Sequence, residues 1–533
     1  MALVINTNIS SIKAQINLER TQFSLSSSLQ RISSGLRINS PKDDAAGLAI
    51  SQRLTSQVGK LGMAVRNAND GISFIQSAEV ALADVSTMLQ RIQELATQAL
   101  NGASGATDRG LLQAQVVKLN ESIGQVAETA KFNGQKVLTG KVVNAEFQVG
   151  ILAEETIRVT IPKITSSNIG NYSIKTDNTR ASAIGAANLT VEQGSVPTNF
   201  VNSQTITIRG FSSSQTGTEV AIEDGETAKS IAEKINTVEV LTGVTAIATS
   251  YATLEDIYDS AASGAQKISF RLYGVNTKGS DSEDFSKSVS ISATIQSGSS
   301  DDLQGLVTAI NDKSPVTGIT AKAITEKDDE GKNVVKIALS NGGVDIGIEN
   351  FRNDPVSDTD DIPATQMTVR GFKGTEKVTL TEGQSDGVTI GGIVTLNSSK
   401  TFTVTSDAVS DTSLFLSGVG GVPQTADFDS VSSANLSTDE SARLALVAST
   451  SASDFISALR GDLGAIQSRF ESTITNLAAT QENTETAKSR ILDADFAQET
   501  ARLTRAQVLQ QAGIAILAQA NSTPQAVLAL LRT

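Results

Sequence analysis

Residues 507–533 read QVLQQAGIAILAQANSTPQAVLALLRT, one of the most apolar stretches of the chain. Together with Ala506 just before them, Leu509, Gly513, Ile516 and Ala520 follow one another at intervals of three or four residues, which predicts an apolar stripe along a helix. Chain ends usually fray, because few tertiary contacts hold them. We therefore expect a partner to bury this stripe.

The first 40 residues carry matching stripes. Their apolar side chains recur in steps of three and four, in two runs separated by a phase break: Ile5, Ile9, Ile12 and Ile16, then Leu25, Leu29, Ile32 and Leu36. A hairpin of residues 1–40 with residues 500–533 would hide only one stripe of each helix. Copies of the same chain are the simplest source of further partners. Pro524 predicts a kink or a break in the last helix.

The composition disfavours an enzyme. The 533 residues include no Cys, His or Trp, so Ser-His-Asp, Cys-His and HExxH sites are impossible, as are structural zinc sites of Cys and His. Carboxylate, lysine or backbone chemistry stays open on composition alone.

The charge is distributed unevenly. The formal net charge is −14, yet residues 1–40 hold four basic side chains and one acidic, and residues 500–533 hold three basic and none acidic. The stretch between them carries the whole acidic excess, which argues against a nucleic-acid partner. No apolar run is long enough to span a membrane. The N-terminus lacks the pattern of a cleavable signal peptide, which taken alone predicts a cytosolic protein.

Long helices are predicted on both sides of a β-rich middle. NSPKDDAAG (39–47) resembles a helix start with Pro41 at the first helical position, and residues 41–100 then follow a single heptad-like seam. A turn at 101–110 and a helix to about residue 129 follow. A second seam covers 456–477, before the polar stretch 481–490 and the last helix.

The middle, about 131–440, alternates Thr, Val and Ile with Gly, Asn and Asp turns, which predicts strands. SIAEKINTVEVLTGVTAIAT (230–249) matches GLVTAINDKSPVTGITAKAI (305–324) at a constant offset of 75, and TITIRGF (205–211) resembles QMTVRGF (366–372). We expect two or more related α+β modules.

Several segments closely resemble bacterial flagellin. They are SSGLRINSPKDDAAGLAIS (33–51), NANDGISFIQSAEVAL (67–82), LQRIQELATQALN (89–101), FNGQKVLTG (132–140), SRILDADFAQETARLTRAQVLQQAGIAILAQAN (489–521) and PQAVLALLR (524–532). The resemblance covers roughly residues 1–170 and 440–533 and is weaker between them. It implies a multi-domain fold, with an α-helical coiled-coil core formed by the two ends, a β-hairpin region, and inserted β-rich or α+β outer domains.

The resemblance also implies a domain order. Residues 1–40 and 500–533 would form the filament core, residues 41–175 and 439–499 the helical inner domain with its β-hairpins, and residues 176–438 the variable outer domains. Within the outer domains we expect a repeat near 205–250 and 288–340 and a further module at 366–430.

The implied function is a structural subunit of the extracellular flagellar filament, exported unfolded by the flagellar type III pathway without a cleavable signal. Expected partners are further copies, the cap and hook–filament junction proteins, an export chaperone at the C-terminus and Toll-like receptor 5, but neither nucleic acid nor membrane. No catalytic residue, cofactor or metal is expected. The residues implied in filament-core packing are Ile5, Ile9, Ile12, Ile16, Leu29, Ile32, Leu36, Leu509, Ile516, Val527, Leu528 and Leu531.

Two smaller sets of residues follow from the same motifs. Gly35 and Pro41 would form a spoke between inner and outer tubes, and an assembly and receptor surface would comprise Gln90, Arg91, Glu94 and Leu95. The alternative is that Leu89, Ile92 and Ala96 form a helix seam and the charged residues beside them form a solvated face. At 113–115 the chain has Gln, Ala and Gln in place of the acidic position of receptor-active relatives, which predicts weakened recognition.

Other interpretations are open at this stage. The hook–filament junction protein shares parts of the terminal pattern, and the outer domains could bind glycans or cells, or carry O-linked sugars. The acidic run 353–363 lacks the spacing of a calcium loop, so a solvated loop is favoured. A phosphate-binding loop at 33–47 lacks the required spacing.

Overall fold

The computed structural model describes residues 7–101, 105–141, 144–176, 187–190, 198–210, 217–257, 265–276, 288–296, 300–327, 333–355, 366–371, 377–381, 387–408, 413–415 and 422–530. The chain divides into two compact units. One comprises residues 1–80, 130–162 and 460–533, and the other comprises residues 81–129 and 163–459.

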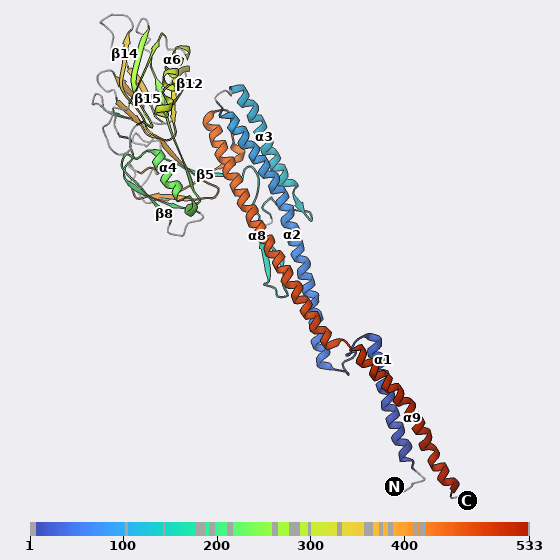
Figure 1. Cartoon of the computed structure of the whole chain (residues 1–533). Coiled ribbons are helices and arrows are strands. Elements are labelled where there is room, and N and C mark those ends of the chain that lie inside the picture. Colours follow the sequence, from blue (N-terminus) through green and yellow to red (C-terminus); the bar gives the residue numbers. More distant parts are fainter. Residues whose placement is uncertain are drawn as a thin grey trace. The chain divides into compact units, whose positions relative to one another are not determined.

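In the first unit the terminal segments form the expected helical hairpin. Helix α1 (Ile9–Ser34) and helix α9 (Phe496–Leu530) lie side by side (Figure 1). They run antiparallel, since the Asn8 amide donates to the Ala520 carbonyl near one end and Ser28 Oγ donates to Glu499 Oε2 near the other. Helix α9 continues through Pro524, so the predicted break is wrong.

Two long helices belong to both units: α2 (Ala45–Ala99) and α8 (Asp439–Leu492). The seam correctly predicted one continuous helix, which at 55 residues is about 80 Å long. The predicted start at Pro41 is wrong. Asp44 caps α2 instead, its Oδ1 accepting from the Gly47 amide at 2.8 Å, while Asp43 Oδ2 accepts from the Asn39 and Ser40 amides. These side chains satisfy backbone donors before the helix begins.

The first unit also holds two small hairpins: β1 (Lys131–Phe132) with β2 (Gln135–Lys136), and β3 (Ala145–Gln148) with β4 (Thr156–Val159). The turn of the first is Asn133-Gly134 with φ of 47° and 79°, a pair favoured in two-residue hairpin turns. The hairpins bring together four phenylalanines at centroid distances of 5.7–5.8 Å: Phe74, Phe132, Phe147 and Phe470.

In the second unit, α3 (Ala106–Thr129) lies against the chain that returns to α8 through the short 3-10 helix η2 (Val431–Ser433). The side-chain amide of Gln113 donates to the Ala434 carbonyl and accepts from the Leu436 amide. Arg109 is buried and pairs with Asp439 at the start of α8. These contacts tie the start of α8 to α3.

The rest of the second unit is built of antiparallel sheets. The five-stranded sheet has the order β11 (Val289–Ile295), β10 (Gln266–Tyr273), β14 (Ile346–Pro355), β17 (Gly387–Ile390), β6 (Ala187–Thr190). The four-stranded sheet has the order β20 (Gln424–Thr425), β19 (Thr403–Ser406), β7 (Gln204–Arg209), β8 (Thr218–Ile222).

The eight-stranded sheet has the order β12 (Thr320–Lys327), β13 (Asn333–Asn341), β9 (Thr245–Glu255), β18 (Ile393–Ser398), β5 (Gly170–Lys175), β21 (Asp427–Ser430), with β15 (Gln366–Arg370) pairing both β9 and β16 (Lys377–Thr381). Strand β9 pairs β18 through residues 245–249 and β13 through residues 250–254. Strand β9 therefore contributes side chains to each of the two hydrophobic cores of this unit.

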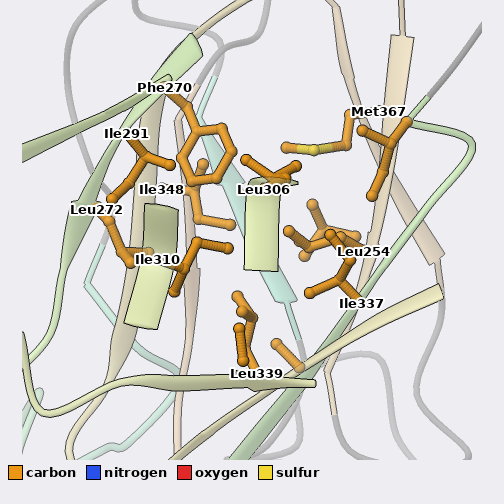
Figure 2. Packing of buried hydrophobic residues seen from close by; sticks show 14 of the residues in the cluster. Leu254, Phe270, Leu272, Ile291, Leu306, Ile310, Ile337, Leu339, Ile348 and Met367 are labelled. Carbon is orange, nitrogen blue, oxygen red and sulfur yellow. The ribbon is translucent and has the colours of Figure 1, made fainter. Parts of the chain in front are cut away.

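Each core contains one helix. In the first core α4 (Ala228–Thr237) packs with β7, β8, β18 and β19. In the second, Figure 2 shows Leu306 and Ile310 of α6 (Ser300–Asn311) among side chains of β9, β10, β11, β13, β14 and β15. The predicted fold class, helical ends with β-rich domains between them, is confirmed.

The similarity at an offset of 75 is confirmed in detail. Each copy has a helix, a second short helix, α5 (Glu239–Thr242) or α7 (Ser314–Thr317), and a strand. Asn236 and Asn311 each donate to, and accept from, the backbone of a strand residue ten positions later, at 2.7–3.0 Å. Gly243 and Gly318 both end a short helix with a left-handed backbone, at φ of 69° and 71°. The duplication therefore reproduces individual hydrogen bonds as well as the order of elements.

Candidate assembly surface

The face that joins α1 to α9 is made mostly of small and polar side chains. On α1, Ser11 and Ser28 are buried, and on α9 Ala506 is buried. A methyl group at Gly513 would lie 3.2 Å from Leu18 Cδ1, so the helices approach closely there. The least exposed positions of α9 are spaced by four and three residues: Glu499, Leu503, Ala506, Gln510, Gly513, Leu517 and Ala520.

Large apolar side chains lie on the outside of this hairpin. Ile9, Ile12, Ile16 and Phe23 are spaced by three, four and seven residues, so they share one face of α1, and 45–67% of each is exposed. Leu29 of α1 and Leu509 and Ile516 of α9 are 49–60% exposed. An apolar surface of this kind on one hairpin marks an interaction site.

This arrangement divides the predicted stripe of α9 between two faces. Ala506, Gly513 and Ala520 face α1, whereas Leu509 and Ile516 do not. Of the other residues predicted to pack in a filament core, Ile32 and Leu36 are half-buried. Ile5 and Leu531 lie outside the described residues, and for Val527 and Leu528 the structure describes the backbone alone.

A buried carboxylate holds one end of the hairpin, and sequence reasoning missed it. Glu499 accepts from Ser28 Oγ at 3.0 Å, from Arg31 Nη1 at 3.1 Å and from Arg502 Nη1 at 3.0 Å. Burial raises the pKa of Glu499, but the hydrogen bonds from Arg31 and Ser28 and the charges of Arg502 and Arg31 outweigh it, so the pKa lies below its ordinary value. The sequence did offer a signal for this contact. Glu499 stands three residues before Arg502 and is the only acidic residue of 496–533.

The chain that leaves α1 pairs with the chain that leaves α8. Gly35 terminates α1 with φ of 70°, and its carbonyl accepts from the Ala494 amide at 3.0 Å. The Arg37 amide donates to the Leu492 carbonyl, and the Arg37 guanidinium donates to the Ile491 carbonyl at 2.7 Å. Gly35 thus lies beside the isolated antiparallel bridge between Leu36 and Asp493.

Pro41 lies in the turn that connects this paired segment to helix α2. Hydrogen bonds from the backbone of Ser40 and Asn39 lower the pKa of Asp43, which closes that turn. Whether Gly35 and Pro41 join two tubes of a filament stays a prediction.

The second predicted surface lies on α2. Gln90, Arg91 and Glu94 are exposed, and Arg91 pairs with Glu94. Leu95 is only 1% exposed, so it belongs to the core and cannot be part of this surface. Its spacing of three from Ile92, which is also buried, was the available signal. At 113–115, Gln113 uses its amide to hold the chain before α8, while Ala114 and Gln115 are exposed.

The described residues contain no group of three or more acidic side chains placed to hold a metal ion. Residues 356–363 of the acidic run lie outside them. None of the described helices is long and apolar enough to cross a membrane.

Comparisons with known proteins cover the whole chain. The family model for the bacterial flagellin N-terminal helical region matches residues 5–142, and that for the C-terminal helical region matches residues 446–531. A B-type flagellin of Pseudomonas aeruginosa is 37% identical over 537 residues, and a flagellin of Salmonella muenchen is 32% identical over 561; each alignment covers 100% of both chains. Among solved structures, FliC from Burkholderia pseudomallei is 16% identical and covers 75% of this chain and 99% of its own, with a TM-score of 0.28.

Proposed function

We propose, because this chain belongs to the bacterial flagellin family, that its terminal helices assemble identical copies into a flagellar filament. Membership of the family supports a structural filament subunit and not an enzyme. The observation that carries the assembly proposal is the outer face of the α1–α9 hairpin, where large apolar residues are left exposed after the two helices have paired.

Burial of that face by other copies is favourable, at roughly 25 cal/mol for each Å² of apolar surface. The outer stripes of α1 and α9 differ in sequence, so a contact between them is heterologous. A heterologous contact whose rotation does not close generates a helical polymer. Ordering and association costs oppose part of the gain, so assembly depends on concentration and is cooperative.

The further properties of the family are part of the same proposal. The chain would be exported unfolded by the flagellar type III pathway, with a chaperone on its apolar C-terminal segment, and would join the extracellular filament between junction and cap proteins. Residues 1–40 and 500–533 would form the filament core, residues 41–175 and 439–499 the surrounding helical layer, and residues 176–438 the outer surface. Gln90, Arg91 and Glu94 would contact neighbouring subunits and Toll-like receptor 5.

The test is seeded polymerisation followed by electron microscopy. The full chain should extend short filament seeds after salting-out, and a chain lacking residues 1–40 and 500–533 should not. If the full chain stays monomeric while the seeds persist, the filament-subunit proposal fails.

A finer version changes only the outer apolar face. The double variant Ile12→Gln with Ile16→Gln should stop elongation, because both side chains are about half exposed on α1. The matched control is Val240→Gln with Leu241→Gln, two exposed apolar residues of α5. Equal loss of assembly in both pairs would show that the terminal hairpin has no special role.

A further inference from the structure

A basic groove of about 700 Å³ lies along the α1–α9 hairpin and includes Phe23 of the exposed apolar stripe of α1. Four guanidinium groups line it: Arg20 and Arg31 of α1, and Arg502 and Arg505 of α9. The hydroxyl groups of neighbouring serines and a threonine of α1 line the same groove. The lining is therefore rich in donors suited to an anionic group.

A single carboxylate of the chain pairs with two of these four guanidinium groups. Glu499 pairs with Arg31 at 3.1 Å and with Arg502 at 3.0 Å. Within the described parts of the chain, neither Arg20 nor Arg505 has a carboxylate at ion-pair distance, and both are exposed. The groove therefore keeps two cations available for an external partner.

The edge of the groove is apolar. Phe23 and Leu509, which also line it, are 67% and 52% exposed. The Lys42 ammonium group lies 5.0 Å from the centre of the Phe23 ring and adds further positive charge. Arginine beside exposed aromatic and apolar side chains is the composition of protein–protein interface centres, and differs from that of a small-ion site.

We propose that this groove receives a carboxylate-bearing segment of a second copy of the chain, with Arg20 and Arg505 as the residues that bind it. Charge complementarity favours a second copy, because residues 439–499, which the proposed function places beside the filament core, hold ten acidic and five basic side chains. The groove also shares Leu509 with the outer apolar face that the proposed function assigns to neighbouring subunits. The inference rests on that function and adds an electrostatic specificity to an otherwise apolar contact.

The first experiment measures the critical concentration for seeded assembly at low and high salt. The double variant Arg20→Gln with Arg505→Gln should raise it about tenfold at low salt and should flatten its salt dependence, because exposed charge pairs are screened by salt. The matched control, Lys13→Gln with Lys60→Gln, makes the same change of charge at exposed positions that do not line the groove.

The outcomes separate the inference from the function on which it rests. If wild-type chain does not extend seeds, the proposed function has failed. If wild-type chain assembles and both double variants behave alike, the groove has no specific role and the inference is wrong, while the filament function stands.

The second experiment identifies the source of the carboxylate. The variant Arg20→Lys with Arg505→Lys keeps the charge and supplies amines that a zero-length carbodiimide reagent couples to a contacting carboxylate. Filaments grown from an equal mixture of ¹⁵N-labelled and unlabelled variant should give mixed-isotope cross-linked peptides containing position 20 or 505, and the monomer should not. Cross-links found only within one chain, or none in filaments that have formed, would overturn the proposal.

Discussion

The substitution Gly71→Ala tests the packing of helix α2, because one aromatic ring decides whether it stabilises or destabilises the protein. In helix α2 a methyl group at Gly71 would lie 2.6 Å from Phe470 Cζ and 2.9 Å from Phe470 Cε1. Carbon atoms pack favourably at about 3.5–4.0 Å, so Gly71→Ala requires the ring to retreat by about 1 Å. Phe470 is fully buried and meets the Phe147 ring edge-on at 5.7 Å, which leaves it little room.

Two effects of opposite sign then compete. Replacing a helix glycine by alanine stabilises by about 1 kcal/mol, whereas forcing a buried side chain aside costs about 1–3 kcal/mol. We expect Gly71→Ala to be neutral or to destabilise, by up to about 2 kcal/mol, because the steric cost equals or exceeds the gain in helix propensity. The control is Gly59→Ala in the same helix, where nothing lies within 4 Å of the new methyl group. That variant should stabilise by about 0.5–1 kcal/mol.

The assay is urea unfolding of the monomer, followed by circular dichroism at 222 nm, with the midpoint of the helical transition compared between variants. A third variant isolates the cause: in a Phe470→Leu background, which removes the ring, Gly71→Ala should become stabilising. The reasoning is refuted if Gly71→Ala stabilises the wild-type chain as much as Gly59→Ala does.

Three further predictions concern polar groups. Glu499→Gln should weaken protection of α1 against hydrogen exchange by about 1–3 kcal/mol at pH 7. Because the folded pKa of Glu499 lies below its ordinary value, this stabilisation should be present above the unfolded pKa and lost as the pH falls through the folded one, in wild type only. Burial raises the pKa of Asp345 from 3.8 to about 7, so the free energy of unfolding of the β-rich unit should decrease as pH rises from about 4 to 7 and then level off. Thermal unfolding at pH 5 and pH 8 should show the decrease in wild type and not in Asp345→Asn. Asn236→Ala and Asn311→Ala should each cost about 1–3 kcal/mol in urea unfolding, because each removes the same pair of backbone contacts; a large loss in only one would contradict equivalence of the two copies.

Periodicity predicted the helices well and their partners poorly. A stripe of residues at steps of three and four fixes an angle around a helix, and α2 and the 456–477 part of α8 follow from it. Helix α8 is longer than its stripe and includes the polar stretch 481–490. It does not tell which stripe meets which neighbour. In the terminal hairpin the predicted stripe of α9 combined small and large residues, yet within the chain only the small ones, such as Ala506 and Gly513, face α1, because small side chains let the helices approach closely.

Local competition explains the error at the start of α2. Pro41 is well suited to a first helical position, but the acids that follow it offered two further caps. Asp43 accepts backbone amides of residues 39 and 40, and Asp44 accepts that of Gly47, so the helix begins only at residue 45. The choice depends on tertiary placement that a single sequence does not specify.

In the outer modules, the sequence repeat was recognisable only in the helix-to-strand part of each copy, where the backbone requires a specific residue type. The offset of 75 links positions where an Asn amide or a left-handed Gly is required. It missed the preceding hairpin. There, a methyl group on Gly210 would clash with the Thr242 carbonyl, and one on Gly274 with the Thr317 carbonyl, so β7 and β10 occupy equivalent places. Because many different apolar residues fit in a strand, β7 and β10 share little sequence, and the glycine that follows each strand is what shows that they are equivalent.

The inner and outer faces of the terminal hairpin differ in composition, and this difference explains why folding and assembly should be coupled. Its inner face fully buries only Ser11, Ser28, Ala506 and Glu499 among the described residues, while its leucines are only half-buried. Pairing therefore removes little apolar surface from water, and the hydrogen bonds of Glu499 hold it at one end. Helices gain most of their stability from tertiary packing of an apolar face. Many large apolar residues of α1 and α9 stay exposed after the helices pair, and under the proposed function other copies supply the packing that they lack. Any partner that binds the folded hairpin also stabilises it by mass action. Polymerisation would then supply the stability that the isolated hairpin lacks, and a variant that enlarged the inner contact should make the monomer more ordered without improving elongation.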